Sequence, residues 1–148
     1  MVQLKLILFN IILSIFFLDY IMDIKLLIIF IIVFVGLDLL WINYFANFIG
    51  PLIEKVQNEK MKIDYMGASL AYIIMLIAYW YIAFDDNYKP DYYKSAILGL
   101  AIYGTYEFTN YATINKWKDL QVLSMDIGWG IFISVVSLYL TTQINSFI

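Results

Sequence analysis

The sequence is 148 residues long, 64% hydrophobic and 19% aromatic, with only 14% charged residues and a formal net charge of −3. A soluble domain is about half apolar and about a quarter charged, so this composition indicates a membrane protein. Histidine and cysteine are absent, which excludes disulfides, thiolate or imidazole nucleophiles, and haem or zinc sites built from these residues. Every basic residue is lysine, and acidic residues outnumber the lysines. We therefore expect no nucleic-acid partner, because such a partner requires a basic surface.

Four apolar runs approach the roughly 20 residues that a helix needs to cross a hydrocarbon core of about 30 Å. Because they are hydrophobic all round, they favour membrane helices over amphipathic surface helices. The sequence therefore predicts an all-α fold, a polytopic transmembrane helix bundle with four core spans and, as one alternative, an additional N-terminal helix. The predicted spans are Leu26–Phe45, Met66–Phe84, Ser95–Ala112 and Leu120–Leu140.

An apolar segment, residues 1–23, precedes the four-span domain, which we place at residues 24–148. Its central part, Leu6–Met22, is short for a span and contains Asn10. It fits a fifth membrane helix, a signal-like segment or an interfacial helix, although it lacks the small-residue cleavage site of a signal peptide. We favour a membrane helix, and translation from Met22 is an alternative start.

The first connection, Ile49–Asp64, has the pattern of a short helix. Pro51 suits the first turn of a helix, because its missing N–H would have no partner there. An apolar face follows, formed by Leu52, Ile53 and Val56. This pattern predicts an amphipathic helix lying on the membrane surface.

Lysines suggest an orientation for the domain. The first and third connections carry most of them and lie on one side of the membrane, whereas Lys25, Lys89 and Lys94 lie on the other. The positive-inside rule makes the lysine-rich side cytoplasmic. The lysines of that side are Lys55, Lys60, Lys62, Lys116 and Lys118.

Three carboxylates interrupt the spans: Asp38 in the first, Glu107 in the third and Asp126 in the fourth. At about 1.5 Å per residue, each lies within roughly 3–6 Å of its span's midpoint, and all fall in the lysine-rich leaflet. A charged acid at mid-bilayer costs about 2.5–3.5 kcal/mol on insertion scales, and no lysine lies within a span to pair with it. We therefore expect one site whose carboxyl groups are protonated, hydrogen-bonded, hydrated or neutralised by a bound cation.

Neighbouring side chains extend this predicted site. Small residues let helices approach closely, and tyrosine, tryptophan and asparagine can donate hydrogen bonds to buried carboxyl groups. Threonine hydroxyls can add neutral oxygens. Beside the three acids, we assign Tyr103, Thr105, Thr109 and Asn110 as binding groups and Trp41, Gly104, Trp129 and Gly130 as supporting residues.

The stretches "LDLLWI" and "MDIGWG" share a D-x-x-W pattern in spans that run in opposite directions. Inverted pairings of this kind occur in transporters. With only two matched residues, we favour chance as the explanation of the shared pattern. We treat these tryptophans as packing or interfacial residues rather than ligand contacts.

Three stretches, "LDLLWI", "YGTYEFTNYATINKW" and "MDIGWG", resemble in order and spacing the bacterial membrane proteins catalogued as a domain of unknown function, DUF2177. The resemblance covers roughly Ile24 to Leu140 and implies a four-span membrane protein without an established reaction. The sequence departs from the family pattern at three positions. Glu107 stands where the family usually has aspartate, Asn43 stands where it usually has a small or apolar residue, and Lys118 stands where it often has proline. The resemblance also covers Tyr106, Ala112, Thr113 and Trp117.

Three classes of function fit these features. The first is binding or transport of a proton, a small cation or a small solute, because oxygen ligands suit H⁺, Na⁺, Mg²⁺ or Ca²⁺. The second is a membrane-embedded enzyme acting on a lipid-like substrate, and the third is a structural or accessory protein with a helix-locking polar network. We lean away from an enzyme, since no motif implies a catalytic residue or cofactor. The expected partners are the lipid bilayer and, for transport, further copies of the chain.

Overall fold

The computed structural model describes the backbone of residues 2–85 and 87–148, and the side chains from residue 24 onwards apart from residue 86. Within these residues the chain forms helices joined by short connections, with one isolated bridge between Phe84 and Pro90 and no sheet. The predicted all-α fold is confirmed. The helices are α1 (Val2–Gln57), α2 (Tyr65–Ala83), α3 (Tyr92–Thr113) and α4 (Leu120–Phe147).

Aspartates begin three of the helices. Asp64, Asp91 and Asp119 are the N-caps of α2, α3 and α4, and each side chain accepts backbone N–H groups of the first turn. An aspartate in this position satisfies donors that the helix leaves unpaired and interacts favourably with the positive end of the helix dipole. These three acids outside the spans therefore have a local structural role.

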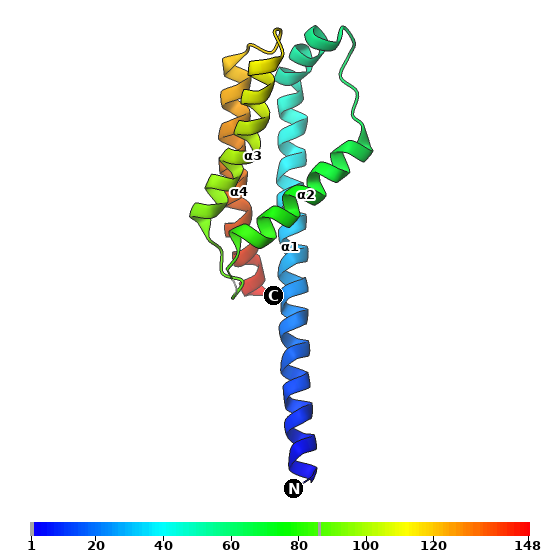
Figure 1. Ribbon diagram of the computed structural model, residues 1–148, viewed down its shortest axis with the longest axis vertical. Coiled ribbons are helices and arrows are strands. Elements are labelled where there is room, and N and C mark those ends of the chain that lie inside the picture. The colour runs from blue at the N-terminus through cyan, green and yellow to red at the C-terminus, as the bar shows by residue number, and fades with distance from the viewer. Residues whose placement is uncertain (1, 86) are drawn as a thin grey trace.

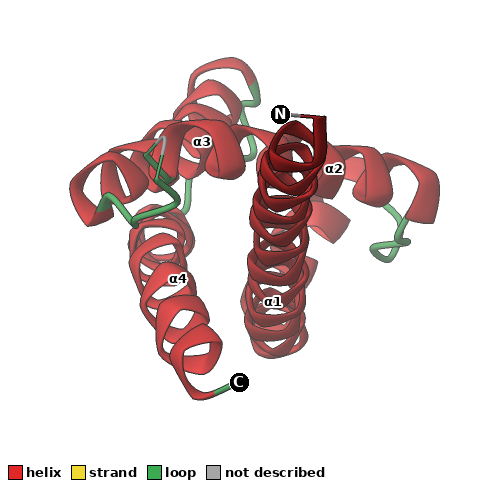
Figure 2. Cartoon of the chain, turned by 90° about the horizontal axis from the view of Figure 1, so that it is seen from below, coloured by secondary structure: helices red, strands yellow, loops and turns green. Residues whose placement is uncertain are grey.

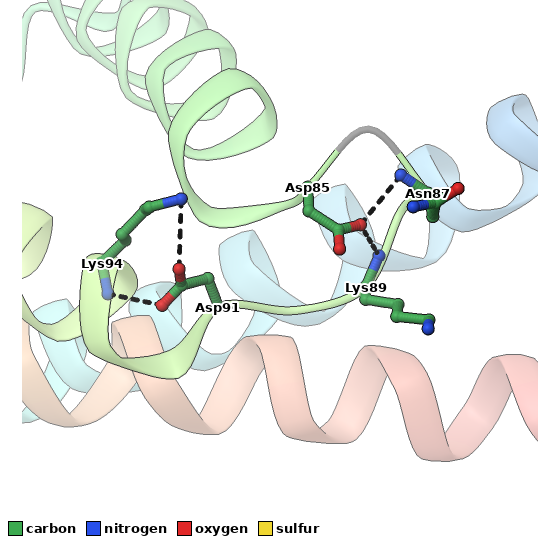
Figure 3. A network of polar contacts seen from close by, with 5 residues as sticks. All are labelled: Asp85, Asn87, Lys89, Asp91 and Lys94. Atoms are coloured by element: carbon green, nitrogen blue, oxygen red, sulfur yellow. Dashed lines mark hydrogen bonds and ion pairs between the residues drawn. The ribbon is translucent and has the colours of Figure 1, made fainter.

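The connection between α2 and α3 is a compact turn held by backbone N–H to carboxylate bonds (Figure 3). Asp85 accepts the N–H of Asn87 at 2.9 Å and that of Lys89 at 2.8 Å. Asp91 accepts the N–H of Lys94 at 3.0 Å, and the Lys94 ammonium lies 3.2 Å from its second oxygen. The pKa of Asp91 is lowered, chiefly because its anionic form accepts the Lys94 backbone N–H.

Helix α1 includes the segment predicted as a separate surface helix. It continues to Gln57 with Pro51 inside it, and its last turns lie at an angle to its long axis (Figure 1). Proline removes one helical hydrogen bond and clashes with the carbonyl one turn earlier, which accounts for such a bend. The prediction of a separate helix is therefore wrong. Helix α1 ends before Asn58, which has a φ of 59°.

The apolar face of this last part of α1 lies on the bundle. Leu52 is buried, and Ile53 and Val56 are half-buried against Trp117 and its neighbours. The face that we expected to contact lipid is covered by protein. We call the group it joins the cap cluster: Phe45, Leu52, Trp117 and Val122 with the half-buried Trp41, Phe48, Ile49, Ile53, Val56, Ile114 and Met125.

Helix α1 is continuous from Val2 through the first predicted span. The choice among a fifth span, a signal-like segment and an interfacial helix for residues 1–23 lies outside the side chains that the structure describes. Among the described residues, three helices are long and apolar enough to cross a membrane: Ile24–Gln57, Tyr65–Ala83 and Leu120–Phe147. Helix α3, with 22 residues, is long enough but is not among them, because polar residues fill its second half. The protein is an integral, multi-pass membrane protein.

Helices α1, α3 and α4 form the packed part of the bundle. The α3–α4 contact is the most extensive and the α1–α4 contact comes next, whereas α2 crosses the others obliquely with few contacts (Figures 1 and 2). A second apolar cluster lies toward the opposite end from the cap cluster. This inner cluster consists of Leu26, Phe30, Phe34, Tyr79, Ala83, Phe84, Ile133 and Leu138.

The first and third connections meet at one end of the bundle, as the alternation of spans predicts. The Lys116 ammonium donates to the backbone carbonyl of Lys55 at 2.8 Å. A cation is favourable at this place, because the carbonyls at a helix C-terminus carry partial negative charge. The cytoplasmic assignment of this lysine-rich end stays a prediction.

Candidate functional site

Asp38 of α1 is bonded to all three other helices. Its side chain is almost fully buried, at 4% exposed. Tyr72 of α2 donates to Oδ2 at 2.6 Å, and Trp129 of α4 and Tyr103 of α3 donate to Oδ1 at 2.8 and 3.2 Å. A deprotonated carboxylate only accepts hydrogen bonds. Three neutral donors therefore satisfy Asp38 and join the four helices at one point.

The two D-x-x-W motifs exchange partners across the α1–α4 interface. Trp129 donates to Asp38. In the reciprocal bond, Trp41 Nε1 donates to Asp126 Oδ1 at 3.4 Å. The two indole rings stack between these bonds, with centroids 4.7 Å apart and planes 8° apart. Because α1 and α4 run in opposite directions (Figure 1), each helix presents its carboxylate to the tryptophan of the other. The two motifs, whose similarity we attributed to chance, are in direct contact.

Glu107 of α3 has no exposed surface. Trp117, in the α3–α4 connection, donates to its Oε2 at 2.9 Å. The other oxygen, Oε1, is buried without a hydrogen-bond partner among the described residues. The carboxyl group of Asp126 lies close enough to interact with Glu107 directly. We call Glu107 and Asp126 the acid pair.

Each intramembrane acid receives one indole N–H. An indole has one donor and no acceptor, so it can stabilise a buried carboxyl oxygen without bringing a charge. The fourth tryptophan, Trp80, instead packs against Phe84 with ring centroids 5.1 Å apart. From the sequence we assigned Trp41 and Trp129 as supporting residues but did not predict which acid each one contacts, and we assigned Trp117 no such role. The pairs are Trp129 with Asp38, Trp41 with Asp126, and Trp117 with Glu107.

The neutral oxygens assigned to the site are not gathered around Glu107. Thr105 and Thr109 lie two residues before and after it, and a helix turns such residues to the opposite face. Both are exposed. Asn110 is half-buried, and its side chain lies close to that of Tyr106. The tyrosine that Asp38 does bond on α2, Tyr72, was missed, because no motif marks it among 13 tyrosines.

Two glycines bring α3 and α4 close together at the site. A Cβ atom at Gly130 would overlap the ring of Tyr103, and one at Gly99 would overlap Ser134 and the Gly130 carbonyl. Gly104, also assigned as supporting, would bring its Cβ only into ordinary contact with Leu100, at 3.6 Å. The glycine at 130 is therefore what allows Tyr103 to lie against α4 while it donates to Asp38.

The acids form two units. Among the described side chains, no three carboxylates gather closely enough to hold a metal ion. Asp38 is satisfied by its three donors, and the acid pair retains an unpartnered oxygen. The pair is therefore the part of the network with unfilled binding capacity.

Comparison with known proteins assigns the chain to a family. A family model described as "Predicted membrane protein (DUF2177)" matches residues 23–143. The chain belongs to the DUF2177 family. The match confirms the resemblance and covers Asp38, the acid pair and all four tryptophans, but the family's description states no activity. No curated protein and no solved structure matches this DUF2177 chain.

In this DUF2177 protein, replacing Trp117 by phenylalanine should lower the free energy of unfolding by about 1–3 kcal/mol, because Glu107 Oε2 loses a buried donor. Trp80→Phe is the matched control, since Trp80 also contacts aromatic rings but makes no hydrogen bond with the described residues. Thermal unfolding in detergent micelles measures both variants. Equal losses would show that the indole N–H of Trp117 contributes nothing.

Proposed function

We propose that the protein binds and exchanges a proton at the acid pair within the membrane. The observation that supports this is that Glu107 Oε1 is buried without a hydrogen-bond partner among the described residues, while the Asp126 carboxyl group lies close to the Glu107 side chain. A protonated carboxyl both donates and accepts, so one proton supplies the donor that Oε1 lacks and removes one of two neighbouring buried charges. The two groups exchange this proton as a unit, so it belongs to the pair rather than to either residue.

A proton suits the pair better than a divalent cation does. Ca²⁺ takes about six to eight oxygen ligands and Mg²⁺ about six in near-octahedral geometry. The Asp38 oxygens already accept three hydrogen bonds, and Thr105 and Thr109 are exposed on the opposite face of α3. A proton needs only the two carboxyl groups that lie together.

The titratable groups that act on the acid pair are acidic or phenolic. Asp38 acts on Asp126 from α1, and Tyr103 and Tyr106 of α3 lie within electrostatic reach of Asp126. No lysine lies within the predicted spans. Repulsion among three carboxylates in a poorly solvated place is relieved when one takes up a proton, and no cationic side chain competes for that role.

Replacing Glu107 by glutamine tests the proposal, because the amide keeps an oxygen for Trp117 and offers Asp126 a donor without titrating. In the wild-type protein, dicyclohexylcarbodiimide, which reacts with protonated carboxyls in membranes, should label the acid pair at low pH and lose this reaction as pH rises. Glu107→Gln should keep the thermal stability and move the pH-dependent labelling of Asp126 to lower pH, because the neutral amide removes the neighbouring carboxylate charge and donates to the Asp126 carboxylate. Mass spectrometry of digested protein measures the labelling at each site.

The control is Glu59→Gln, because Glu59 is exposed and lies 3.5 Å from the Lys62 ammonium, outside the acid pair. It should leave the labelling profile unchanged. A wild-type acid pair that stays unlabelled between about pH 5 and about pH 9, where buried carboxyl groups with a raised pKa titrate, would refute the proton site. In that case the network has the structural role alone.

A further inference from the structure

The acid pair lies near the lysine-rich end of the bundle. Glu107 precedes the end of α3 at Thr113 by six residues, and Asp126 follows the start of α4 at Leu120 by six, which is about 9 Å along each helix axis. Toward the other end, Glu107 lies roughly 22 Å along the axis from Tyr92, the first residue of α3. Water on the lysine-rich side is therefore nearer to the pair.

Trp117 separates the acid pair from that side. It lies in the α3–α4 connection, residues 114–119, yet is only 5% exposed, whereas Asn115, Lys116 and Lys118 are exposed. Its indole N–H donates to Glu107, and its ring meets the Tyr106 ring edge-on at 6.2 Å. The connection thus turns one large side chain inward over Glu107 and keeps its polar neighbours outside.

The connection is fastened by exposed contacts. The Lys116 ammonium donates to the Lys55 carbonyl, and the Lys118 ammonium donates to the Tyr111 carbonyl and lies 4.1 Å from the centre of the Tyr111 ring. Exposed charge contacts of this kind contribute little net stability, and connections open locally more readily than packed helices. The exposed contacts that hold this cover in place are therefore weaker than the buried contacts between the packed helices.

The opposite direction is closed by close packing. Gly99 of α3 lies directly against the Gly130 backbone and Ser134 of α4, and Ser95 donates to the Ser134 carbonyl at 2.8 Å. Beyond this contact lie Phe30, Phe34 and Tyr79 of the inner cluster, all fully buried. Protein interiors packed this tightly leave no room for a file of water molecules.

We infer that the α3–α4 connection is the opening of the site, that the acid pair exchanges its proton only with water on the lysine-rich side, and that Trp117 is the positioning residue that closes it. When the connection lifts, a carboxyl O–H bond breaks, the proton passes to a water molecule and the carboxylate keeps the electron pair. When it closes, the Trp117 N–H again donates to Glu107 Oε2. This inference rests on the proposed proton site.

The absence of cysteine allows a test of sidedness with single introduced thiols. In sealed proteoliposomes, Asn115→Cys is captured with an impermeant biotin-maleimide, which separates molecules with the connection outside from those with it inside. A water-soluble carbodiimide with an amine nucleophile is added outside only. We expect the acid pair to be modified at least fivefold more in connection-outside molecules. Equal modification in both orientations, or more in the other, overturns the inference.

A second test locks the connection. Lys55→Cys with Lys116→Cys is bridged by a short bis-methanethiosulfonate, which a reducing agent removes. Modification of the acid pair should fall at least fivefold on bridging and recover on reduction. Bridging Lys89→Cys to Lys94→Cys at the opposite turn is the control and should change nothing. Unchanged modification in the first bridged protein contradicts the role of the connection.

Failure of this inference and failure of the proton site give different results. The permeant reagent dicyclohexylcarbodiimide reaches the pair through lipid whether or not the connection opens. Loss of its pH-dependent labelling refutes the proton site and the inference together. A different result refutes the opening alone. In that case dicyclohexylcarbodiimide labels the pair normally, but neither the orientation of the protein nor the bridge changes modification by the water-soluble carbodiimide.

Discussion

Replacing Asp38 by asparagine should lower the free energy of unfolding by on the order of 3 kcal/mol or more, because hydrogen bonds to a charged group contribute about 1.5–3 kcal/mol each. Asp38 accepts from Tyr72, Tyr103 and Trp129 on three different helices. An asparagine keeps one acceptor oxygen, so Tyr103 and Trp129 would donate to a neutral oxygen and the Tyr72 hydroxyl would have to accept from the amide instead of donating. All three bonds lose their charged partner. Denaturant or thermal unfolding in detergent micelles measures the loss.

The control for this substitution is Asp64→Asn at the start of α2. Asp64 Oδ1 accepts the N–H groups of Met66 and Gly67 at 2.9 and 3.2 Å, and an asparagine oxygen can accept both. Asparagine and aspartate are about equally good N-caps, so the change should stay within about 0.5 kcal/mol. If Asp38→Asn were no more destabilising than Asp64→Asn, Asp38 would not hold the helices together.

Replacing Gly130 by alanine should lower the free energy of unfolding by about 2–3 kcal/mol, because the added methyl group overpacks a tight helix contact. The new Cβ would overlap the Tyr103 ring. Tyr103 cannot move aside without losing its bond to Asp38, so α3 must shift from α4. The same unfolding measurement, with the pH profile of carbodiimide labelling, shows whether the acid pair is disturbed as well.

Gly128→Ala is a matched control two residues away on the same helix. A Cβ atom at Gly128 has no neighbour within 4 Å, and alanine favours a helix over glycine by up to about 1 kcal/mol. This variant should be unchanged or more stable. Opposite signs for the two alanine variants are the expected result, and destabilisation of both by the same amount would contradict a steric origin in the α3–α4 contact.

The helices were predictable wherever local chemistry marks their ends. The second span was predicted as Met66–Phe84 and is Tyr65–Ala83, and the fourth begins at Leu120 as predicted. In both cases an apolar run follows an aspartate N-cap. The end of α1 was predicted wrongly. Pro51 suits the first turn of a new helix, but a proline also occurs at a bend inside a longer helix, and local sequence does not distinguish the two.

The acids of the candidate site could be predicted from the sequence, but most of the side chains that bond to them could not. Asp38, Glu107 and Asp126 stood out because carboxylates in apolar spans are costly. Their division into a satisfied acid and an acid pair was not visible, because it depends on which donors the other helices supply. Trp117 was noted through the family resemblance, but its contact with Glu107 requires the α3–α4 connection to turn back into the bundle.

The sequence by itself determined that this is a multi-pass membrane protein, because hydrocarbon thickness and helical rise convert residue numbers into positions across a bilayer. On the same grounds it predicts three acids at one depth. It also contained the two D-x-x-W motifs without showing that they meet. Only the tertiary structure decided that Trp129 bonds Asp38 and Trp41 bonds Asp126. Contacts between helices depend on how each helix is rotated and how closely it approaches its neighbour. Here the opposite directions of α1 and α4 and the glycine contacts between α3 and α4 set both.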